Sequence, residues 1–205
     1  AVIDDSTAYG QGLADEFVAA VKASGGQIVK REHTNDKAVD FAAVLTSIKA
    51  TNPDAIFFGG YDQQAAPMAK QMKALGMNIK LMGGETMNSA KFIELAGPAA
   101  EGNVASTPGA ALESHPGGKA FAEKYKERYK QDIGLYAPYF YDGVMLLAAA
   151  MQAANSTDPK KVVPALAKIK HKGITADIEF DAKGDLTKGL LTIFQVKNGK
   201  WEVVS

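Results

Sequence analysis

The sequence predicts an α/β fold built on a doubly wound parallel sheet. Three observations support this prediction. Short apolar segments alternate with amphipathic helical segments through the first hundred residues, which is typical of strands connected through helices. The segment 55–58, Ala-Ile-Phe-Phe, is apolar at every position, as expected of a parallel strand that helices cover on both faces. The length of 205 residues corresponds to one large domain or two small ones.

Strands and helices are expected to alternate as far as Pro108. Apolar side chains spaced by about four residues define one face of each helix. Gly25-Gly26 and Gly76 end helices because glycine adopts left-handed backbone conformations without strain, and Pro53 cannot continue the second helix. In chain order we expect a strand at 2–3, a helix carrying Leu13, Phe17 and Val21, a strand at 27–30, a helix capped by Asp40 and carrying Phe41, Val44, Leu45 and Ile48, a strand at 55–58, a helix carrying Met68, Met72 and Leu75, a strand at 81–82, a helix at 91–96 and a strand at 104–106.

The segment after Pro108 has a different pattern, in which helices follow one another without strands. The expected elements are helices at 119–131, 138–154 and 159–168, a strand at 178–180, and hairpin strands at 191–196 and 201–204. Asp158-Pro159 is typical of a helix start, and Asn198-Gly199 is a strong signal for a two-residue hairpin turn. The helix at 138–154 is nearly all apolar, and no strand predicted beside it would cover it.

Composition and charge exclude several classes of function. The chain carries 23 Lys+Arg and 23 Asp+Glu, so it has no net charge with which to attract nucleic acid or an acidic membrane surface. It has no cysteine, which excludes disulfides, thiolate catalysis and Cys-ligated metals. The longest apolar run, 144–154, is shorter than the roughly 20 residues that span a bilayer. We therefore expect neither nucleic-acid binding nor direct membrane insertion.

The sequence lacks the familiar motifs for catalysis, metals and cofactors. The three histidines, His33, His115 and His171, are far apart and do not have the spacing of a metal site. No Gly-x-Ser-x-Gly nucleophile elbow is present, and no lysine follows a glycine turn as in a phosphate-binding loop. Gly10-Gln11-Gly12 lacks the third glycine of a dinucleotide site. The sequence therefore predicts no enzyme activity, no metal and no cofactor.

Candidate ligand-binding residues lie in three turns, because ligands of open parallel sheets bind beyond the carboxyl ends of the strands. The turns are at 6–11, 59–63 and 83–88, and their distinctive side chains are Tyr9, Tyr61, Asp62, Glu85 and Thr86. Aromatic rings together with carboxylates favour a small molecule with a cationic group over a phosphate. The alternative is structural: the tyrosines pack, and the two carboxylates stabilise the starts of the helices that follow them.

Four groups of residues occur in an order and with gaps that carry a family signature. They are Asp5-Ser6-Thr7-Ala8-Tyr9-Gly10-Gln11-Gly12, then Asn52-Pro53-Asp54-Ala55 before Phe58-Gly59-Gly60-Tyr61, then Met82-Gly83-Gly84-Glu85, and finally Phe180-Asp181-Ala182-Lys183-Gly184-Asp185. Together they resemble the leucine/isoleucine/valine-binding proteins, the periplasmic solute receptors of branched-chain amino-acid ABC transporters. The resemblance covers essentially the whole chain.

The resemblance implies a type I periplasmic binding protein that closes two lobes around an amino acid and delivers it to the membrane permease of an ABC transporter. Residues 1–108 resemble the second, C-terminal lobe, 109–188 a return segment that completes the first lobe, and 189–205 a terminal hairpin of the second lobe. The N-terminal part of the first lobe has no counterpart, and Ala1 begins in what reads as a strand, so we expect a part of a longer chain that would also carry any export signal. The implied location is the periplasm, or the cell exterior with a lipid anchor in a Gram-positive host.

The same resemblance implies ligand-binding roles. Tyr9 and Tyr61 match ligand-facing tyrosines of the second lobe, and Glu85 matches the carboxylate that pairs with the ligand's α-ammonium. Asp62 is common beside the second tyrosine, and Tyr136 falls where the family has an aromatic residue near the pocket. Two other functions stay open. One is a type I ligand-sensing domain for amides or small carboxylates in a regulatory protein; the other is a flavodoxin-like enzyme, for which the sequence shows no phosphate loop or nucleophile–base pair.

Overall fold

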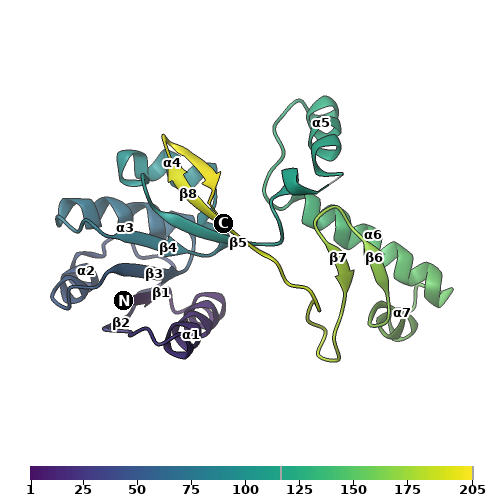
Figure 1. The fold of residues 1–205 in the computed structure, drawn as a ribbon, viewed down its shortest axis with the longest axis horizontal. Coiled ribbons are helices and arrows are strands. Elements are labelled where there is room, and N and C mark those ends of the chain that lie inside the picture. The colour runs from purple at the N-terminus through teal and green to yellow at the C-terminus, as the bar shows by residue number, and fades with distance from the viewer. Residues whose placement is uncertain (116, 205) are drawn as a thin grey trace. The chain divides into compact units, whose positions relative to one another are not determined.

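The computed structural model describes residues 1–115 and 117–204. The chain forms two compact units, both visible in Figure 1. Unit 1 consists of Ala1–Thr107 and Ile193–Ser205, and unit 2 consists of Pro108–Thr192. The sequence-based assignment of the chain's segments to two lobes of a receptor stays a prediction.

Unit 1 is built on a seven-stranded sheet with the order β2-β1-β3-β4-β5-β8-β9. Its strands are β1 (Val2–Asp4), β2 (Arg31–His33), β3 (Ala55–Gly59), β4 (Lys80–Gly83), β5 (Val104–Pro108), β8 (Leu191–Lys197) and β9 (Lys200–Val203). The first five strands pair in parallel, and β8 and β9 form an antiparallel hairpin at one edge. The chain winds from β1 to β2 in one direction and through β3 to β5 in the other. The sheet is therefore doubly wound, and the predicted fold class is confirmed.

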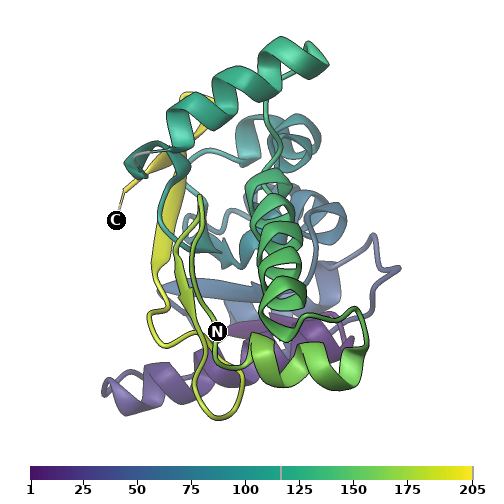
Figure 2. The same ribbon diagram turned by 90° about the vertical axis from the view of Figure 1, so that its right-hand side faces the viewer.

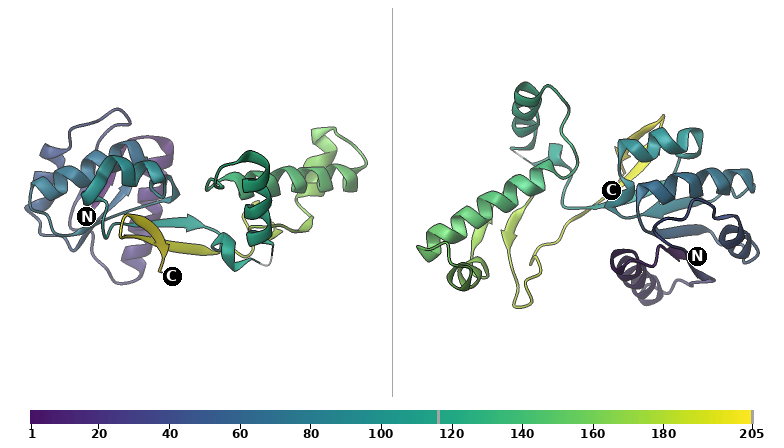
Figure 3. Two further views of the ribbon diagram at one scale, coloured as in Figure 1. Left: turned by 90° about the horizontal axis from the view of Figure 1, so that it is seen from above. Right: turned by 180° about the vertical axis from the view of Figure 1, so that it is seen from behind.

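Helices cover both faces of this sheet (Figures 1 and 3). One face carries α1 (Ala8–Ala23), and the other carries α2 (Ala42–Lys49), α3 (Asp62–Ala74) and α4 (Ala90–Ala96). Short 3-10 turns, η1 (Glu85–Met87) and η2 (Gly97–Ala99), follow β4 and α4. This arrangement requires strands that are apolar on both sides.

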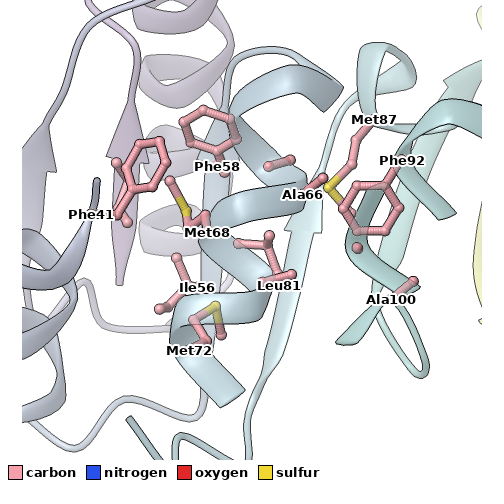
Figure 4. Packing of buried hydrophobic residues seen from close by; sticks show 14 of the residues in the cluster. Phe41, Ile56, Phe58, Ala66, Met68, Met72, Leu81, Met87, Phe92 and Ala100 are labelled. Atoms are coloured by element: carbon pink, nitrogen blue, oxygen red, sulfur yellow. The ribbon is translucent and has the colours of Figure 1, made fainter. Parts of the chain in front are cut away.

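β3 meets that requirement with alternating side chains. Ile56 and Phe58 pack into the larger buried cluster, together with Met68 and Met72 of α3 (Figure 4). Phe57 belongs to the smaller cluster on the α1 side, where its ring stacks on Phe17 with the ring centroids 3.9 Å apart. Burial of such side chains contributes about 1.5–3 kcal/mol each, so these two clusters hold the sheet and its helices together.

The predicted position of the second strand is wrong. The prediction was 27–30, whereas the structure places β2 at Arg31–His33, in register with Val2–Asp4. Ile28 and Val29 supplied the apolar signal, but Ile28 packs against the α1 cluster and Val29 is exposed. β2 is an edge strand, where charged residues are tolerated and protect the free edge from other chains. An apolar pattern therefore does not mark it.

Two smaller features concern helix and hairpin ends. Asp40 was predicted to be the cap residue of the second helix. In the structure α2 begins at Ala42, and Phe41 occupies the cap position. The Asp40 carboxylate nevertheless accepts a hydrogen bond of 3.0 Å from the Ala42 backbone N–H. The predicted final hairpin is confirmed, with Asn198 and Gly199 both at positive φ, 52° and 71°, as a type I′ turn requires.

Unit 2 is mainly helical. Its elements are η3 (Leu112–Ser114), α5 (Gly118–Tyr129), α6 (Ala137–Ala154), α7 (Pro159–Leu166), β6 (Lys170–Lys172) and β7 (Asp177–Glu179). α6 and α7 pack against each other (Figure 2), and Asp158 caps α7 as predicted by accepting a hydrogen bond from the Lys160 N–H. β6 was not predicted, because its Lys-His-Lys sequence has no apolar alternation and it exists only through its antiparallel pairing with β7.

Asp142 anchors the loop between β6 and β7 to α6. The side chain is 3% exposed, and its two oxygens accept hydrogen bonds of 2.7 Å from the backbone N–H groups of Ile174 and Thr175. The Thr175 hydroxyl donates a further bond of 2.6 Å. A buried carboxylate is costly without such donors, so this loop and α6 form one structural piece.

α6 exposes a large part of its apolar surface. Phe140 and Val144, one helical turn apart, are 74% and 64% exposed, and Met145 and Leu147 are also exposed. Within residues 1–115 and 117–204, no helix is long and apolar enough to cross a membrane. Monomeric proteins in water rarely leave contiguous apolar surface uncovered.

We therefore expect the 205-residue chain, produced alone, to self-associate or aggregate. Size-exclusion chromatography with light scattering should give a mass above that of one chain. The double substitution Phe140→Ser and Val144→Ser should shift the chain toward the monomer, whereas Gln152→Ser, at an exposed polar position of the same helix, should not. A parent chain that stays monomeric at every accessible concentration contradicts this expectation.

Candidate functional site

The candidate site lies where the strand order of unit 1 reverses. β1 and β3 are neighbours, and the chain leaves them toward opposite sides of the sheet. A crevice forms beyond the carboxyl ends of the two strands at such a point, and it is the usual binding position of doubly wound sheets. Tyr9 follows β1, Tyr61 follows β3, and Glu85 follows the next strand, β4.

Two glycines bring the turns after β1 and β3 together. A Cβ atom built on Gly10 would lie 2.5 Å from the carbonyl oxygen of Gly59, and one built on Gly59 would overlap the carbonyl oxygen of Gly10. Any larger residue at either position would push the start of α1 away from β3. The hydroxyl of Thr7, at the cap position, accepts a hydrogen bond of 3.0 Å from the Gly10 N–H and fixes where α1 begins.

The close approach places the two tyrosines side by side. The ring centroids of Tyr9 and Tyr61 are 5.4 Å apart with the planes tilted by 44°. Tyr61 is 43% exposed, and Tyr9 is half-buried. The pair forms an aromatic surface that is still open to solvent on the Tyr61 side, as a contact surface for a ligand must be.

Glu85 joins this pair through its carboxylate. The Tyr9 hydroxyl donates to Glu85 Oε2 at 3.2 Å and lies 3.1 Å from the hydroxyl of Thr86. The Thr86 hydroxyl donates in turn to the carbonyl oxygen of Gly60 at 2.6 Å. Within the described part of the chain, no Lys, Arg or His forms an ion pair with half-buried Glu85.

Asp62 lies at the start of α3, next to Tyr61, and bonds within the fold. The Ser89 hydroxyl donates to Asp62 Oδ2 at 2.6 Å and also caps α4 by accepting a hydrogen bond from the Phe92 N–H at 2.9 Å. The Ser89 carbonyl accepts a hydrogen bond from the indole N–H of Trp201. Asp62 thus connects the starts of two helices, and its predicted contact with a ligand stays a prediction.

Tyr136 belongs to unit 2. It occupies the cap position of α6 and is 47% exposed. The other four predicted residues belong to unit 1, where Tyr9 contacts both Tyr61 and Glu85. The role predicted for Tyr136 stays a prediction.

An ion cluster below the first turn was missed by the sequence analysis. Asp4, at the end of β1, is fully buried and accepts hydrogen bonds from Arg31 at 3.1 Å and from the Ser6 N–H at 3.1 Å, while His33 Nδ1 lies 2.9 Å away. The available signal was an aspartate directly after a buried strand. Its partners could not be found, because the strand that carries them was misplaced.

These partners determine the pKa of Asp4. Burial by itself would raise the pKa, but the hydrogen bonds from His33, Arg31 and the Ser6 N–H together outweigh burial and lower it below the ordinary value. Asp4 is therefore ionised in the folded chain and helps to hold β2 and the turn of Tyr9 in place.

Among residues 1–115 and 117–204, no group of three or more acidic or histidine side chains could hold a metal ion.

Comparison with known proteins links this geometry to a family. Residues 1–200 match the periplasmic binding protein family. The chain is 30% identical over 195 residues to the leucine-, isoleucine-, valine-, threonine- and alanine-binding protein of Pseudomonas aeruginosa, covering 95% of this chain and 52% of that protein. The chain thus spans about half the length of the curated relatives it matches.

Solved structures agree with this match. A leucine-binding protein of Thermotoga maritima superimposes with a TM-score of 0.91 at 29% identity, covering 100% of this chain and 59% of that one. The branched-chain amino-acid transporter substrate-binding protein of Streptococcus pneumoniae, solved in complex with isoleucine, gives 0.78 at 26% identity, covering 99% and 58%.

The lowered pKa of Asp4 predicts an acid-dependent contribution to stability. Because the pKa in the folded chain is below that in the unfolded chain, the stabilisation is fully present above about pH 4, the ordinary range of an aspartate, and is lost as the pH falls further. Asp4→Asn should reduce the free energy of unfolding at pH 7 by about 1.5–3 kcal/mol, the range for hydrogen bonds to a charged group.

Urea unfolding of the parent and of Asp4→Asn between pH 7 and pH 2 measures this contribution. The difference between the two proteins should shrink as the pH falls below about 4. Asp36→Asn, at an exposed loop position, is the matched control and should follow the parent throughout. A difference that is constant over the whole pH range contradicts the assignment.

Proposed function

The chain belongs to the periplasmic binding protein family and has its type I fold, and we propose on this basis that it binds an amino acid, branched-chain or related, through Tyr9, Tyr61 and Glu85. Relatives and structural neighbours of this chain are amino-acid-binding proteins by name. Since the chain spans about half of their length, the activity of the whole protein is part of the proposal.

The observation that carries the proposal is that Glu85 and its neighbours have fewer hydrogen-bond donors than contacts between oxygen atoms. Two contacts, Tyr9 to Glu85 and Tyr9 to Thr86, share the single hydroxyl proton of Tyr9, because the proton of Thr86 is donated to Gly60. One of the two oxygen–oxygen contacts therefore lacks a proton at any moment. An N–H group from a ligand, placed between the carboxylate and the phenol oxygen, would supply it.

An α-ammonium group meets this need better than other small groups. It carries three donors and no acceptor, and its positive charge pairs with the carboxylate of Glu85. The apolar side chain of an amino acid would lie against the rings of Tyr9 and Tyr61, and a cation near these rings gains a further attraction. An anion such as phosphate would instead meet the carboxylate and be repelled.

The remaining parts of the proposal concern the whole protein. A solute-binding receptor of this family performs no chemistry, since it binds its ligand between two lobes and closes around it. We propose that the protein delivers the amino acid to the permease of an ABC transporter. We place it in the periplasm, or outside the cell on a lipid anchor. Tyr136 and Asp62 are proposed as additional ligand contacts.

A thermal-shift screen of the full-length protein against the amino acids, small amides, aromatic acids, nucleotides and flavins tests the ligand class. Stabilisation by branched-chain or related amino acids supports the proposal, because a ligand that binds only the folded state raises its stability. Stabilisation by amides or carboxylates without an ammonium group would favour the ligand-sensing alternative. A response to nucleotides or flavins would favour the enzyme.

Glu85→Gln should weaken amino-acid binding more than any other single substitution at this site. The change keeps the shape but removes the charge, so the ammonium of the ligand is left without its partner. Loss of one member of a desolvated pair costs about 3–5 kcal/mol, which corresponds to about two to three decades or more in affinity. Tyr9→Ala and Tyr61→Ala should weaken binding less, because the charged partner of the ammonium stays in place.

Calorimetric titration of the full-length protein measures these affinities. Glu94→Gln is the matched control, because Glu94 is exposed in the same unit and pairs with Lys91 at the surface. The control should bind as the parent does. Binding by Glu85→Gln within about threefold of the parent would show that the ammonium does not bind at Glu85.

A further inference from the structure

Thr86 is the least obvious member of the candidate site. The sequence analysis named it among the distinctive side chains of the three turns, but the family resemblance assigned no ligand-binding role to it. In the structure its hydroxyl stands between two other groups, with the Gly60 carbonyl oxygen at 2.6 Å and the Tyr9 hydroxyl oxygen at 3.1 Å. The residue lies in η1, directly after the carboxylate.

The bond to Gly60 determines the direction of the other bond. A carbonyl oxygen can only accept, so the single proton of the Thr86 hydroxyl points to Gly60. Thr86 can then act toward Tyr9 only as an acceptor. In the hydrogen bond between the hydroxyls of Tyr9 and Thr86, the proton must therefore come from Tyr9.

The same proton is the one that Tyr9 donates to Glu85 at 3.2 Å. Thr86 and Glu85 therefore compete for it. If the proton points to Glu85, it occupies the carboxylate oxygen and faces the position of an incoming ammonium. If it points to Thr86, the phenol oxygen turns its acceptor capacity toward the ammonium, and Glu85 Oε2 is released as well.

We propose that Thr86 is a positioning residue for ammonium recognition: it accepts the Tyr9 proton when the ligand binds, and so makes Tyr9 an acceptor beside Glu85. This inference rests on the proposed function and deepens it. The chain Tyr9 to Thr86 to Gly60 is then a relay of donors that ends on a backbone carbonyl. The ligand class that this arrangement selects is a primary ammonium rather than a neutral hydroxyl compound, since only the ammonium donates to both oxygens and carries charge.

The test is a double-mutant cycle on the full-length protein, with L-leucine as the probe in calorimetric titration. Thr86→Val keeps the shape of the side chain and removes the hydroxyl, and we expect it to weaken leucine binding by about tenfold, the usual effect of one hydrogen bond. Thr86→Ser should rescue most of this loss. In the Tyr9→Phe background, where no proton has to be accepted, Thr86→Val should have an effect of less than about twofold.

Controls separate this role from a structural one. Thr46→Val, on the exposed side of α2, should bind as the parent does. The melting temperature of each variant shows whether it is folded, and Thr86→Ala takes the place of Thr86→Val if the latter is not.

Three outcomes decide the inference. Coupling between Tyr9 and Thr86 together with rescue by serine supports it. If the parent binds leucine and Thr86→Val weakens binding equally with and without the Tyr9 hydroxyl, Thr86 only supports the turn, and the inference fails while the proposed function stands. If the parent binds no leucine and no other amino acid in the thermal-shift screen, the proposed function fails and the inference with it.

Discussion

The close contact between Gly10 and Gly59 is the constraint on which the candidate site depends. It allows the first turn of α1 to lie directly against the end of β3, at the point where the strand order reverses. Without this approach the rings of Tyr9 and Tyr61 could not lie 5.4 Å apart, and the Tyr9 hydroxyl could not reach the turn after β4. Three separate turns thus become one surface because two residues have no side chain.

The carboxylates of Asp4, Asp62 and Glu85 have different surroundings, and the differences indicate which of them serve the fold and which is available to a ligand. Asp4 is fully buried and satisfied by Arg31, His33 and a backbone N–H. Asp62 bonds to Ser89 and joins two helix starts. Glu85 instead shares one tyrosine proton with Thr86. Of these three, Glu85 is the one best able to gain from a ligand cation, since pairing displaces only the bond from Tyr9, whose proton Thr86 can accept.

Unit 2 illustrates the same reasoning for apolar groups. Asp142 accepts hydrogen bonds from three donors in the loop before β7, so the buried carboxylate of α6 is satisfied within the unit. The side chains of Phe140 and Val144 on the same helix are largely exposed. The buried carboxylate of α6 has its hydrogen bonds, whereas apolar side chains of the same helix are in contact with water. Covering these side chains would therefore stabilise the chain, because burial of apolar area is favourable.

The sequence by itself determined the α/β class, most helices, the final hairpin and the family. These follow from local signals: apolar side chains spaced for helices, an all-apolar strand at 55–58, and Asn198-Gly199 in a turn that needs positive φ. It also identified Tyr9, Tyr61 and Glu85 as candidates, because side chains after parallel strands meet at one sheet edge. The tertiary structure alone decided the position of β2 and the existence of β6, since both are polar strands formed by pairing. It also decided which oxygen bonds to which at Glu85. Hydrogen-bond direction depends on distances of a few tenths of an ångström between residues far apart in the chain, and no local pattern encodes them.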